Sequence, residues 1–306
     1  MTDILSFFEN HFRNSAPAFF KEYERTRSAE PAALVQLAQP MLSWAQQALG
    51  EGFEDQLIEG YCTFVMDVNR AQLAYEKNGR YEHDNFADVF EKAYSNHDFM
   101  DLYHWGVYCS TFIWLHHLKI FKFFNNHFLP LIAKQTAKGQ LLDLGAGSGI
   151  WHLLALTHLP AWKVTAVDIS QPSIEISARM ASALPVANNI EHICTDATTW
   201  TSDRLMDAGI SSFLLEHLEH PEKLLSALAG ALKPGAHAFV TCALTAAEID
   251  HIYEFKRESE IVALFESVGF RVKHLFSAEP EATPADRKYL PRSLAAVLQK
   301  RHNNIW

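Results

Sequence analysis

The chain has 306 residues, of which 48 % are hydrophobic and 20 % charged, and its formal net charge is −10 at pH 7. This composition excludes a disordered or collagen-like chain, and the excess of acidic residues argues against a nucleic acid or an anionic membrane as the main partner, because such partners select a basic face. The length allows one large domain or two smaller ones.

The cysteines and the N-terminal segment indicate a compartment. Cys62, Cys109, Cys194 and Cys242 lie far apart with no CxxC pair, which predicts reduced, buried thiols. The first residues carry acidic side chains and no basic segment before an apolar run, so we expect no signal peptide. No stretch reaches the roughly 20 apolar residues of a membrane span. We therefore expect a cytoplasmic protein without membrane contact.

Residues 1–137 have helical periodicity, with apolar residues recurring three and four positions apart. Helices are predicted over residues 4–20, 34–49, 53–75 and 86–94. A long segment, residues 99–134, is apolar on nearly every side, which predicts a buried helix or two helices with a break near Asn125 and Asn126. We expect residues 1–137 to form an all-helical cap domain that holds the substrate.

From residue 138 onward, strand-like and helix-like segments alternate. Strands are predicted over residues 140–144, 163–167, 190–194, 208–213, 236–242, 270–277 and 294–299. Helices are predicted over residues 150–158, 172–183, 221–232 and 259–268. The alternation predicts the α/β class, with a doubly wound, mostly parallel, seven-stranded Rossmann-like sheet over residues 138–306. The last two strands are joined by a proline-bearing loop, so we expect an antiparallel pair at the sheet edge.

The segment LLDLGAGSGI, residues 141–150, is the most informative in the chain. A strand ends here, Gly145, Gly147 and Gly149 alternate, and a helix then begins. Alternating glycines permit positive φ and let a ligand approach the backbone where a Cβ would clash. Asp143 stands two residues before the first glycine, and we expect its carboxylate to point into the turn.

Two more acids follow at the ends of the next two strands. Asp168 is placed to accept the hydroxyls of a ribose, and the position of Asp196 suits an adenine amino group. The glycine spacing is GxGxG and not the GxGxxG of dinucleotide folds, and Asp143 would repel a pyrophosphate but can bind an ammonium group. The predicted ligand therefore combines adenosine with a cationic amino-acid end, which describes S-adenosylmethionine.

Residues 140–299 resemble the class I S-adenosylmethionine-dependent methyltransferases, in their small-molecule branch. The resemblance rests on LDLGAGSG, on EHLEHPEKLL after the fourth strand, and on LKPGA, where Ala236 replaces a second glycine. The family's ribose acid matches Asp168 and its adenine-side acid matches Asp196, and the resemblance implies that Ser211 and Ser212 line the methionine part of the cofactor. The full set of cofactor contacts that it implies is Asp143, Gly145, Ala146, Gly147, Gly149, Asp168, Ile169, Asp196, Ala197, Ser211 and Ser212. The resemblance also implies that residues 215–217 open the next helix.

Ten aromatic side chains lie between residues 99 and 128. They fit a buried core helix, and they equally fit a dry chamber over the sulfonium, whose charge aromatic faces favour. Within this segment Tyr103 and Tyr108 are candidates to hydrogen-bond the methionine end of the cofactor, and Tyr108 is also a catalytic candidate.

The histidine-rich sequence offers candidates for a general base, because the ordinary pKa of histidine lies near neutral pH. His104, His117 and His217 are these candidates. His217 and His220 stand three apart as metal ligands can, but their turn is expected to be solvated, and we expect no metal. Asp250, His251 and Tyr253 follow the fifth strand, either in a solvated connection or in contact with substrate.

The resemblance implies transfer of a methyl group from S-adenosylmethionine to an N, O or C nucleophile of a small molecule under the cap. In the alternative, S-adenosylmethionine is itself consumed, by a cyclase or aminocarboxypropyl transferase similar to azetidine-2-carboxylate synthase that releases methylthioadenosine. We expect a small-molecule acceptor, no nucleic acid, and a monomer or homodimer.

Overall fold

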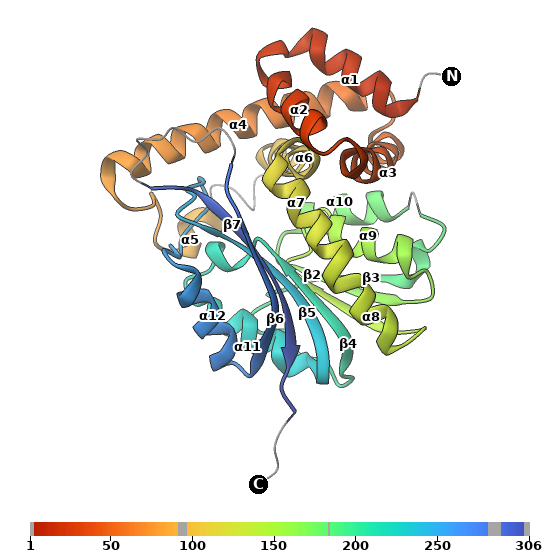
Figure 1. The fold of residues 1–306 in the computed structure, drawn as a ribbon, viewed down its shortest axis with the longest axis vertical. Helices are drawn as coiled ribbons and strands as arrows, with labels where there is room; N and C mark the ends of the chain where they lie inside the picture. Colours follow the sequence, from red (N-terminus) through yellow and green to blue (C-terminus); the bar gives the residue numbers. More distant parts are fainter. Residues whose placement is uncertain (1–2, 91–96, 183, 281–288, 303–306) are drawn as a thin grey trace.

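The computed structural model describes residues 3–90, 97–182, 184–280 and 289–302. Helices fill the first part of the chain and a sheet with flanking helices fills the second (Figure 1). The first part contains α1 (Ile4–Ser15), α2 (Pro17–Ala29), α3 (Pro31–Leu49), α4 (Phe53–Asn78), α5 (Phe86–Val89), α6 (His97–Ile113), α7 (Leu115–Phe123), the π-helical turn η2 (Phe124–Phe128) and α8 (Leu129–Gln135).

Two predicted helices are divided differently in the structure. The helix expected over 4–20 is split, because Pro17 begins α2 and Pro cannot continue the ladder of α1. The break expected near Asn125 and Asn126 is wrong: the helix turns at Trp114, whose backbone is extended, and the two asparagines lie inside η2. The helix expected over 86–94 is described only to residue 90, and the rest of that segment lies outside the described residues.

The described residues form one seven-stranded sheet in the order β3-β2-β1-β4-β5-β7-β6. Its strands are β1 (Gln140–Leu144), β2 (Lys163–Asp168), β3 (Ile190–Cys194), β4 (Met206–Ser212), β5 (Leu232–Leu244), β6 (Phe270–Ala278) and β7 (Arg292–Lys300). Strands β1 to β5 pair in parallel, and β7 pairs antiparallel with both β5 and β6. This is the doubly wound, mostly parallel, seven-stranded sheet that the sequence predicts, with its antiparallel pair at the edge.

Side chains alternate between the two faces of each strand, and each face has its own buried cluster. On β5, Phe239 packs with the helical first part and with α9 (Ile150–His158) and α10 (Gln171–Ala181). Its neighbours Ala238 and Val240 pack on the other face with α11 (Pro221–Ala231) and α12 (Glu258–Ser267). The first cluster runs without interruption from α1 to the sheet, so the division at residues 137 and 138 stays a prediction.

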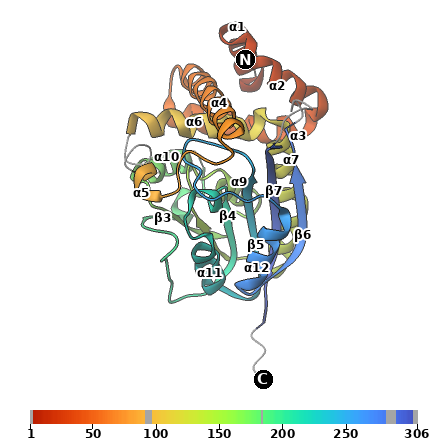
Figure 2. The ribbon, with the colours of Figure 1, turned by 90° about the vertical axis from the view of Figure 1, so that its left-hand side faces the viewer.

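Helices α4 and α6 pack against each other beside the carboxyl ends of the parallel strands (Figure 2). Two glycines make this contact close. A Cβ on Gly106 would lie 2.3 Å from Cβ of Phe64 and 2.7 Å from the carbonyl oxygen of Gly60. The backbones of α4 and α6 therefore approach to a distance that side chains would prevent.

The four cysteines are free thiols, as predicted, but they are not all buried. Cys109 and Cys242 are buried, Cys62 is half-buried and Cys194 is exposed at the end of edge strand β3.

Among the described helices, none combines the length and apolar character that crossing a membrane requires.

Candidate functional site

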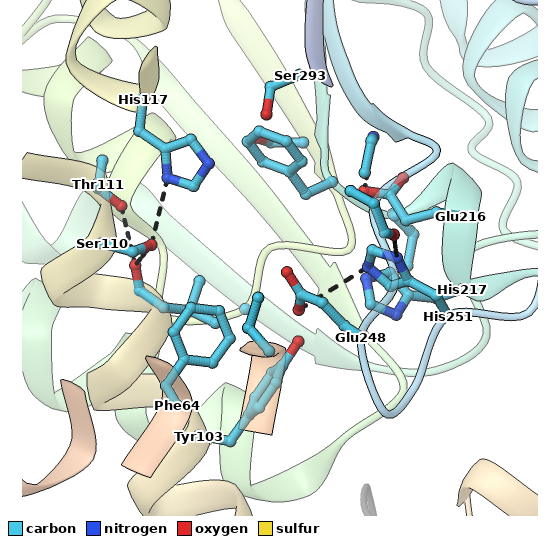
Figure 3. Close-up of a pocket in the computed structure, with 18 of the residues that line it drawn as sticks. Phe64, Tyr103, Ser110, Thr111, His117, Glu216, His217, Glu248, His251 and Ser293 are labelled. Carbon is cyan, nitrogen blue, oxygen red and sulfur yellow. Dashed lines mark hydrogen bonds and ion pairs between the residues drawn. The ribbon is translucent and has the colours of Figure 1, made fainter. Parts of the chain in front are cut away.

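A cavity of about 850 Å³ lies between the helices of the first part and the carboxyl ends of the parallel strands. Its walls come from α2, α4 and α6 on one side and from the turns after β1 to β5 on the other. Figure 3 shows side chains from both groups pointing into one space. The carboxyl ends of parallel strands are where open α/β sheets bind their ligands.

The glycine turn after β1 lines one end of this cavity. Gly145, Gly147 and Gly149 have φ of +74°, +53° and +85°, which favours glycine. A Cβ on Gly145 would lie 2.3 Å from the side chain of Leu214, whereas one on Gly147 would meet only His104, at 4.0 Å. A side chain at Gly147 would therefore project into the cavity and fill the space over the turn. Ala146 also lines the cavity; Gly149 packs instead against Ser177.

Asp168 ends β2 at the same side of the cavity. Its two carboxylate oxygens accept hydrogen bonds from the backbone amides of Gly147 and Ser170, each at 2.9 Å. Burial raises the pKa of this carboxyl, and the two amides partly offset that effect. Each oxygen retains a lone pair for a ligand hydroxyl. Ile169 lines the cavity beside it.

The acid after β3 is also on the cavity wall. Asp196 accepts hydrogen bonds from the backbone amide and hydroxyl of Thr198, at 2.8 and 2.7 Å, and Ala197 lines the wall next to it. Ser212 lines the cavity at the end of β4. Ser211 points away, since its hydroxyl donates to the carbonyl of Leu144.

Besides Gly149 and Ser211, two more predicted site residues, Asp143 and Tyr108, do not line the cavity. Asp143 is buried, and its carboxylate faces Nδ1 of His152 at 2.8 Å, so its nearest partner is an imidazole of α9. The expectation that Tyr108 lies near the reacting groups is wrong. Tyr108 is fully buried among helices, where its hydroxyl donates a hydrogen bond to the carbonyl of Met41. Tyr108 faces the core side of α6, whereas Tyr103 faces the cavity.

The three candidate histidines all line the cavity, but none has a pKa near neutrality. Burial lowers the pKa of His104 to about 4 and that of His117 to about 3. His104 is hydrogen-bonded to Ser173, and Nδ1 of His117 lies 3.3 Å from the hydroxyl of Ser110. Burial alone would lower the pKa of His217 too, but the carboxylate of Asp250 outweighs it and raises this pKa to about 10.

A largely buried group of acids and histidines also borders the cavity. The sequence analysis names His217, Asp250 and His251 of this group but misses Glu216 and Glu248. Glu216 and His217 belong to the 3₁₀ turn η4 (Leu215–His217), and Glu248, Asp250 and His251 to the segment after β5 (Figure 3). Burial raises the pKa of Glu216 to about 7 and that of Glu248 to about 8. The sequence signal that could have revealed this group is the closeness of acids and histidines in EH (residues 216–217) and in EIDH (residues 248–251).

Two expectations about these segments are wrong. Residues 215–217 do not open the next helix; they form a separate 3₁₀ turn, and α11 begins at Pro221. His217 is not solvated, because the segment after β5 covers it, whereas Glu219 and His220 after it are exposed as expected. Of the three residues predicted after the fifth strand, Asp250 and His251 are buried. Only Tyr253 of these three is exposed, as expected for a solvated connection.

The ten aromatic side chains near residues 99–128 divide between the two interpretations. Tyr103 and Trp114 line the cavity. Seven others are buried in the hydrophobic core, namely Trp105, Tyr108, Phe112, Phe121, Phe123, Phe124 and Phe128. The side chain of Phe99 lies outside the described residues. Further aromatic residues of the wall come from other segments, including Phe64 of α4 and Phe213 after β4.

Comparison with known proteins agrees with this geometry. A family model described as a methyltransferase domain matches residues 114–275, more than half of the chain. An uncharacterised protein of Synechococcus is 32 % identical over 130 residues, which is 40 % of this chain and 30 % of that protein. A ubiquinone biosynthesis O-methyltransferase of Cupriavidus pinatubonensis is 28 % identical over 102 residues, 33 % of this chain and 40 % of that enzyme.

These matches span less than half the length of the curated relatives. Among solved structures, that of a putative sarcosine dimethylglycine methyltransferase from Galdieria sulphuraria has a TM-score of 0.49 at 14 % identity. It covers 60 % of this chain and 88 % of that one.

The chain belongs to the methyltransferase domain family, and its fold is that of the class I S-adenosylmethionine-dependent members. S-adenosylmethionine is accordingly its cofactor. The site fits this molecule, because Gly147 leaves space over the turn that a Cβ would occupy, and two acids stand beside that space.

Proposed function

We propose that this protein transfers the methyl group of S-adenosylmethionine to an N, O or C nucleophile of a small molecule bound among the helices of the first part. The observation that carries the proposal is the extent of the cavity. The glycine turn, Asp168 and Asp196 form only one end of it, and it continues to Phe19 of α2 and Phe64 of α4. The remaining space is suited to a second, largely apolar molecule.

In this proposal the residues of the sheet hold the methyl donor. Asp168 accepts the ribose hydroxyls, Asp196 and Ala197 face the adenine, and Gly145 to Gly147 lie against the amino-acid part. Tyr103 and Ser212 line the same cavity, and we assign them to the methionine side. When bound, S-adenosylmethionine supplies an electrophilic methyl group on a sulfonium, and holding the acceptor in line with it provides most of the acceleration.

We assign the cavity histidines to positioning and not to proton transfer. Neutral imidazoles at His104 and His117 can accept a hydrogen bond from the acceptor over the whole physiological pH range, since their pKa values lie at about 4 and 3. With nothing bound to its ring, His217 is protonated at neutral pH because its pKa is about 10, so it cannot accept a proton. The aromatic walls and the helices above exclude water, which favours the attack of a desolvated nucleophile.

The alternative reaction uses the same site differently. If S-adenosylmethionine were the sole substrate, attack of its own amino group on the γ-carbon would form a ring and release methylthioadenosine. The part of the cavity that extends beyond the cofactor end favours methyl transfer, because a cyclase needs no second molecule.

The nucleoside product distinguishes the two reactions. The full chain is incubated with S-adenosylmethionine, first alone and then with a panel of phenols, amines and carboxylic acids, and the nucleosides are separated by chromatography. We expect S-adenosylhomocysteine to form only when an acceptor is present. Methylthioadenosine formed without acceptor would exclude the methyltransferase proposal. The Asp168→Ala variant serves as the control for product formed outside this site.

A further inference from the structure

The buried acid and histidine group has a geometry that the methyl-transfer proposal does not use. Glu216, His217 and His251 each offer one ligand atom, and these atoms lie within 4.8 Å of one another. The histidine rings are 4.8 Å apart and nearly perpendicular. Figure 3 shows the three side chains converging from two segments, η4 and the segment after β5.

In Glu216, His217 and His251, the second polar atom of the side chain, which would not bind a ligand, contacts another group of the protein. Oε1 of Glu216 accepts a hydrogen bond from the amide of Ala243 at 3.0 Å. Nδ1 of His217 lies 3.3 Å from a carboxylate oxygen of Asp250, and Nδ1 of His251 lies 2.6 Å from the carbonyl of Ala246. Metal-binding histidines and carboxylates have such outer partners, which fix the ring tautomer and aim the remaining atom.

The remaining oxygen of Glu216 points to an occupant. Oε2 of Glu216 is buried and has no hydrogen-bond partner among the described residues, although the side chain is fully shielded from water. A buried carboxylate oxygen without a partner is costly. His217 and His251 are 7 % and 2 % exposed, so the space between the three side chains admits an ion more readily than an organic cation.

The charge of the group and the types of its ligand atoms indicate which kind of ion it would bind. Two further carboxylates, Glu248 and Asp250, lie around the histidines: Glu248 is 3.8 Å from Nε2 of His251. The surplus of negative charge favours a divalent cation. Two imidazoles and one carboxylate suit Zn²⁺, Fe²⁺ or Mn²⁺, whereas Mg²⁺ and Ca²⁺ prefer oxygen ligands alone.

We propose that Oε2 of Glu216 and the Nε2 atoms of His217 and His251 bind one divalent transition-metal ion, with Glu248 beside its open side toward the cavity. The ion ties η4 to the segment after β5, and both segments line the cavity. It thereby fixes this part of the cavity wall. Binding of the ion requires neither cofactor nor acceptor, so it is tested independently of the methyl-transfer proposal.

The test uses the full chain, freed of metal by dialysis against a chelator and then titrated with Co²⁺, whose visible absorption reports the ligand set. We expect one equivalent to bind with a d–d spectrum of nitrogen and oxygen coordination, and Zn²⁺ to displace it. Glu216→Gln keeps the size of the side chain and an acceptor for the Ala243 amide, and it should weaken Co²⁺ binding at least 100-fold. Asp250→Asn removes only an outer partner and should weaken it about 10-fold.

The matched control is His127→Gln. His127 and His274 form a second pair of adjacent rings outside the cavity, 4.6 Å apart, and they would account for adventitious binding by surface histidines. This variant should bind Co²⁺ as the parent does. No saturable binding to the parent, or binding that Glu216→Gln leaves unchanged while His127→Gln abolishes it, would overturn the proposal. Circular dichroism of Glu216→Gln establishes that it is folded, and should it unfold, Asp250→Asn provides the decisive comparison.

Discussion

The carboxylate of Asp168 is oriented before any ligand arrives, because the amides of Gly147 and Ser170 each hold one of its oxygens. Replacing Asp168 with Ala removes the proposed ribose contacts and also frees the glycine turn. The loss of one charge-assisted hydrogen bond is worth about 1.5–3 kcal/mol, which weakens S-adenosylmethionine binding roughly 10- to 100-fold. Isothermal titration calorimetry measures this change. Asp203→Ala, at an exposed acid, should bind like the parent, and equal affinity of Asp168→Ala would contradict the ribose assignment.

His104 should make stability depend on pH. Its pKa falls from the ordinary 6.5 to about 4 on burial, although the charge of Asp250 acts in the opposite direction. The unfolded chain therefore binds the proton more tightly, and stability is lost as pH falls from about 6.5 to about 4, with no effect above that window. Each pKa unit corresponds to about 1.4 kcal/mol, so the loss comes to about 3.5 kcal/mol once the folded chain is fully protonated.

Urea unfolding at pH 7 and at pH 4.5, compared between the parent and His104→Gln, tests this effect. Gln keeps a partner for Ser173 and does not titrate. The parent should lose more stability than the variant between the two pH values. Equal losses would mean that His104 remains solvated or already protonated in the folded chain.

The places of Gly147, Asp168 and Asp196 on the cavity wall could be predicted, because each is defined by neighbours within a few positions of the chain, whereas the orientation of Asp143 toward His152 could not. The group around Glu216 could not, since its members come from segments more than thirty residues apart and meet only when the segment after β5 folds over η4. Tyr108 and Tyr103 illustrate the same limit: both lie on α6, and only the packing of that helix determines which one faces the cavity.

At the scale of elements, the crossing of α4 and α6 depends on Gly106. Ala has the higher helix propensity, yet a Cβ here would overlap Phe64 and the carbonyl of Gly60. Overpacking of this kind costs about 1–3 kcal/mol, so Gly106→Ala should lower the free energy of unfolding. Gly230→Ala is the control, because Gly230 also lies in a helix but has open space around it, and this change should stabilise by up to about 1 kcal/mol. Denaturant titration measures the change in the free energy of unfolding, which should be negative for Gly106→Ala and positive for Gly230→Ala. A stabilised Gly106→Ala variant would contradict the close crossing of α4 and α6.

Most elements follow from local pattern. The strands and the helices between them lie within a few residues of their predicted bounds, because period-two and period-3.6 patterns differ clearly in this part of the chain. The apolar segment of α6 to α8 carries no such information. It is hydrophobic all round, so nothing local marks the turn at Trp114, and its place is set by packing between α4 and the sheet.

At the scale of the whole molecule, one hydrophobic cluster joins α1 to the sheet. We therefore expect the helical part and the sheet to unfold in a single transition, although the sequence alone suggests two domains. Far-ultraviolet circular dichroism and tryptophan fluorescence should give coincident denaturation curves. S-adenosylmethionine at about 1,000 times its Kd should raise the free energy of unfolding of the whole chain by about 4 kcal/mol. An early phase that the ligand does not shift would show that the first helices unfold separately.

Strand β7 lies between β5 and β6, although it follows both of them in the chain. While the polypeptide is being synthesised, β6 leaves the ribosome with no neighbour to pair with, and it must wait until residues 292–300 are released. The sheet is therefore completed only when β7 inserts between β5 and β6. A nascent chain stalled before residue 292 would expose the open edges of β5 and β6 together, which makes this interval the one in which chaperones have most to protect.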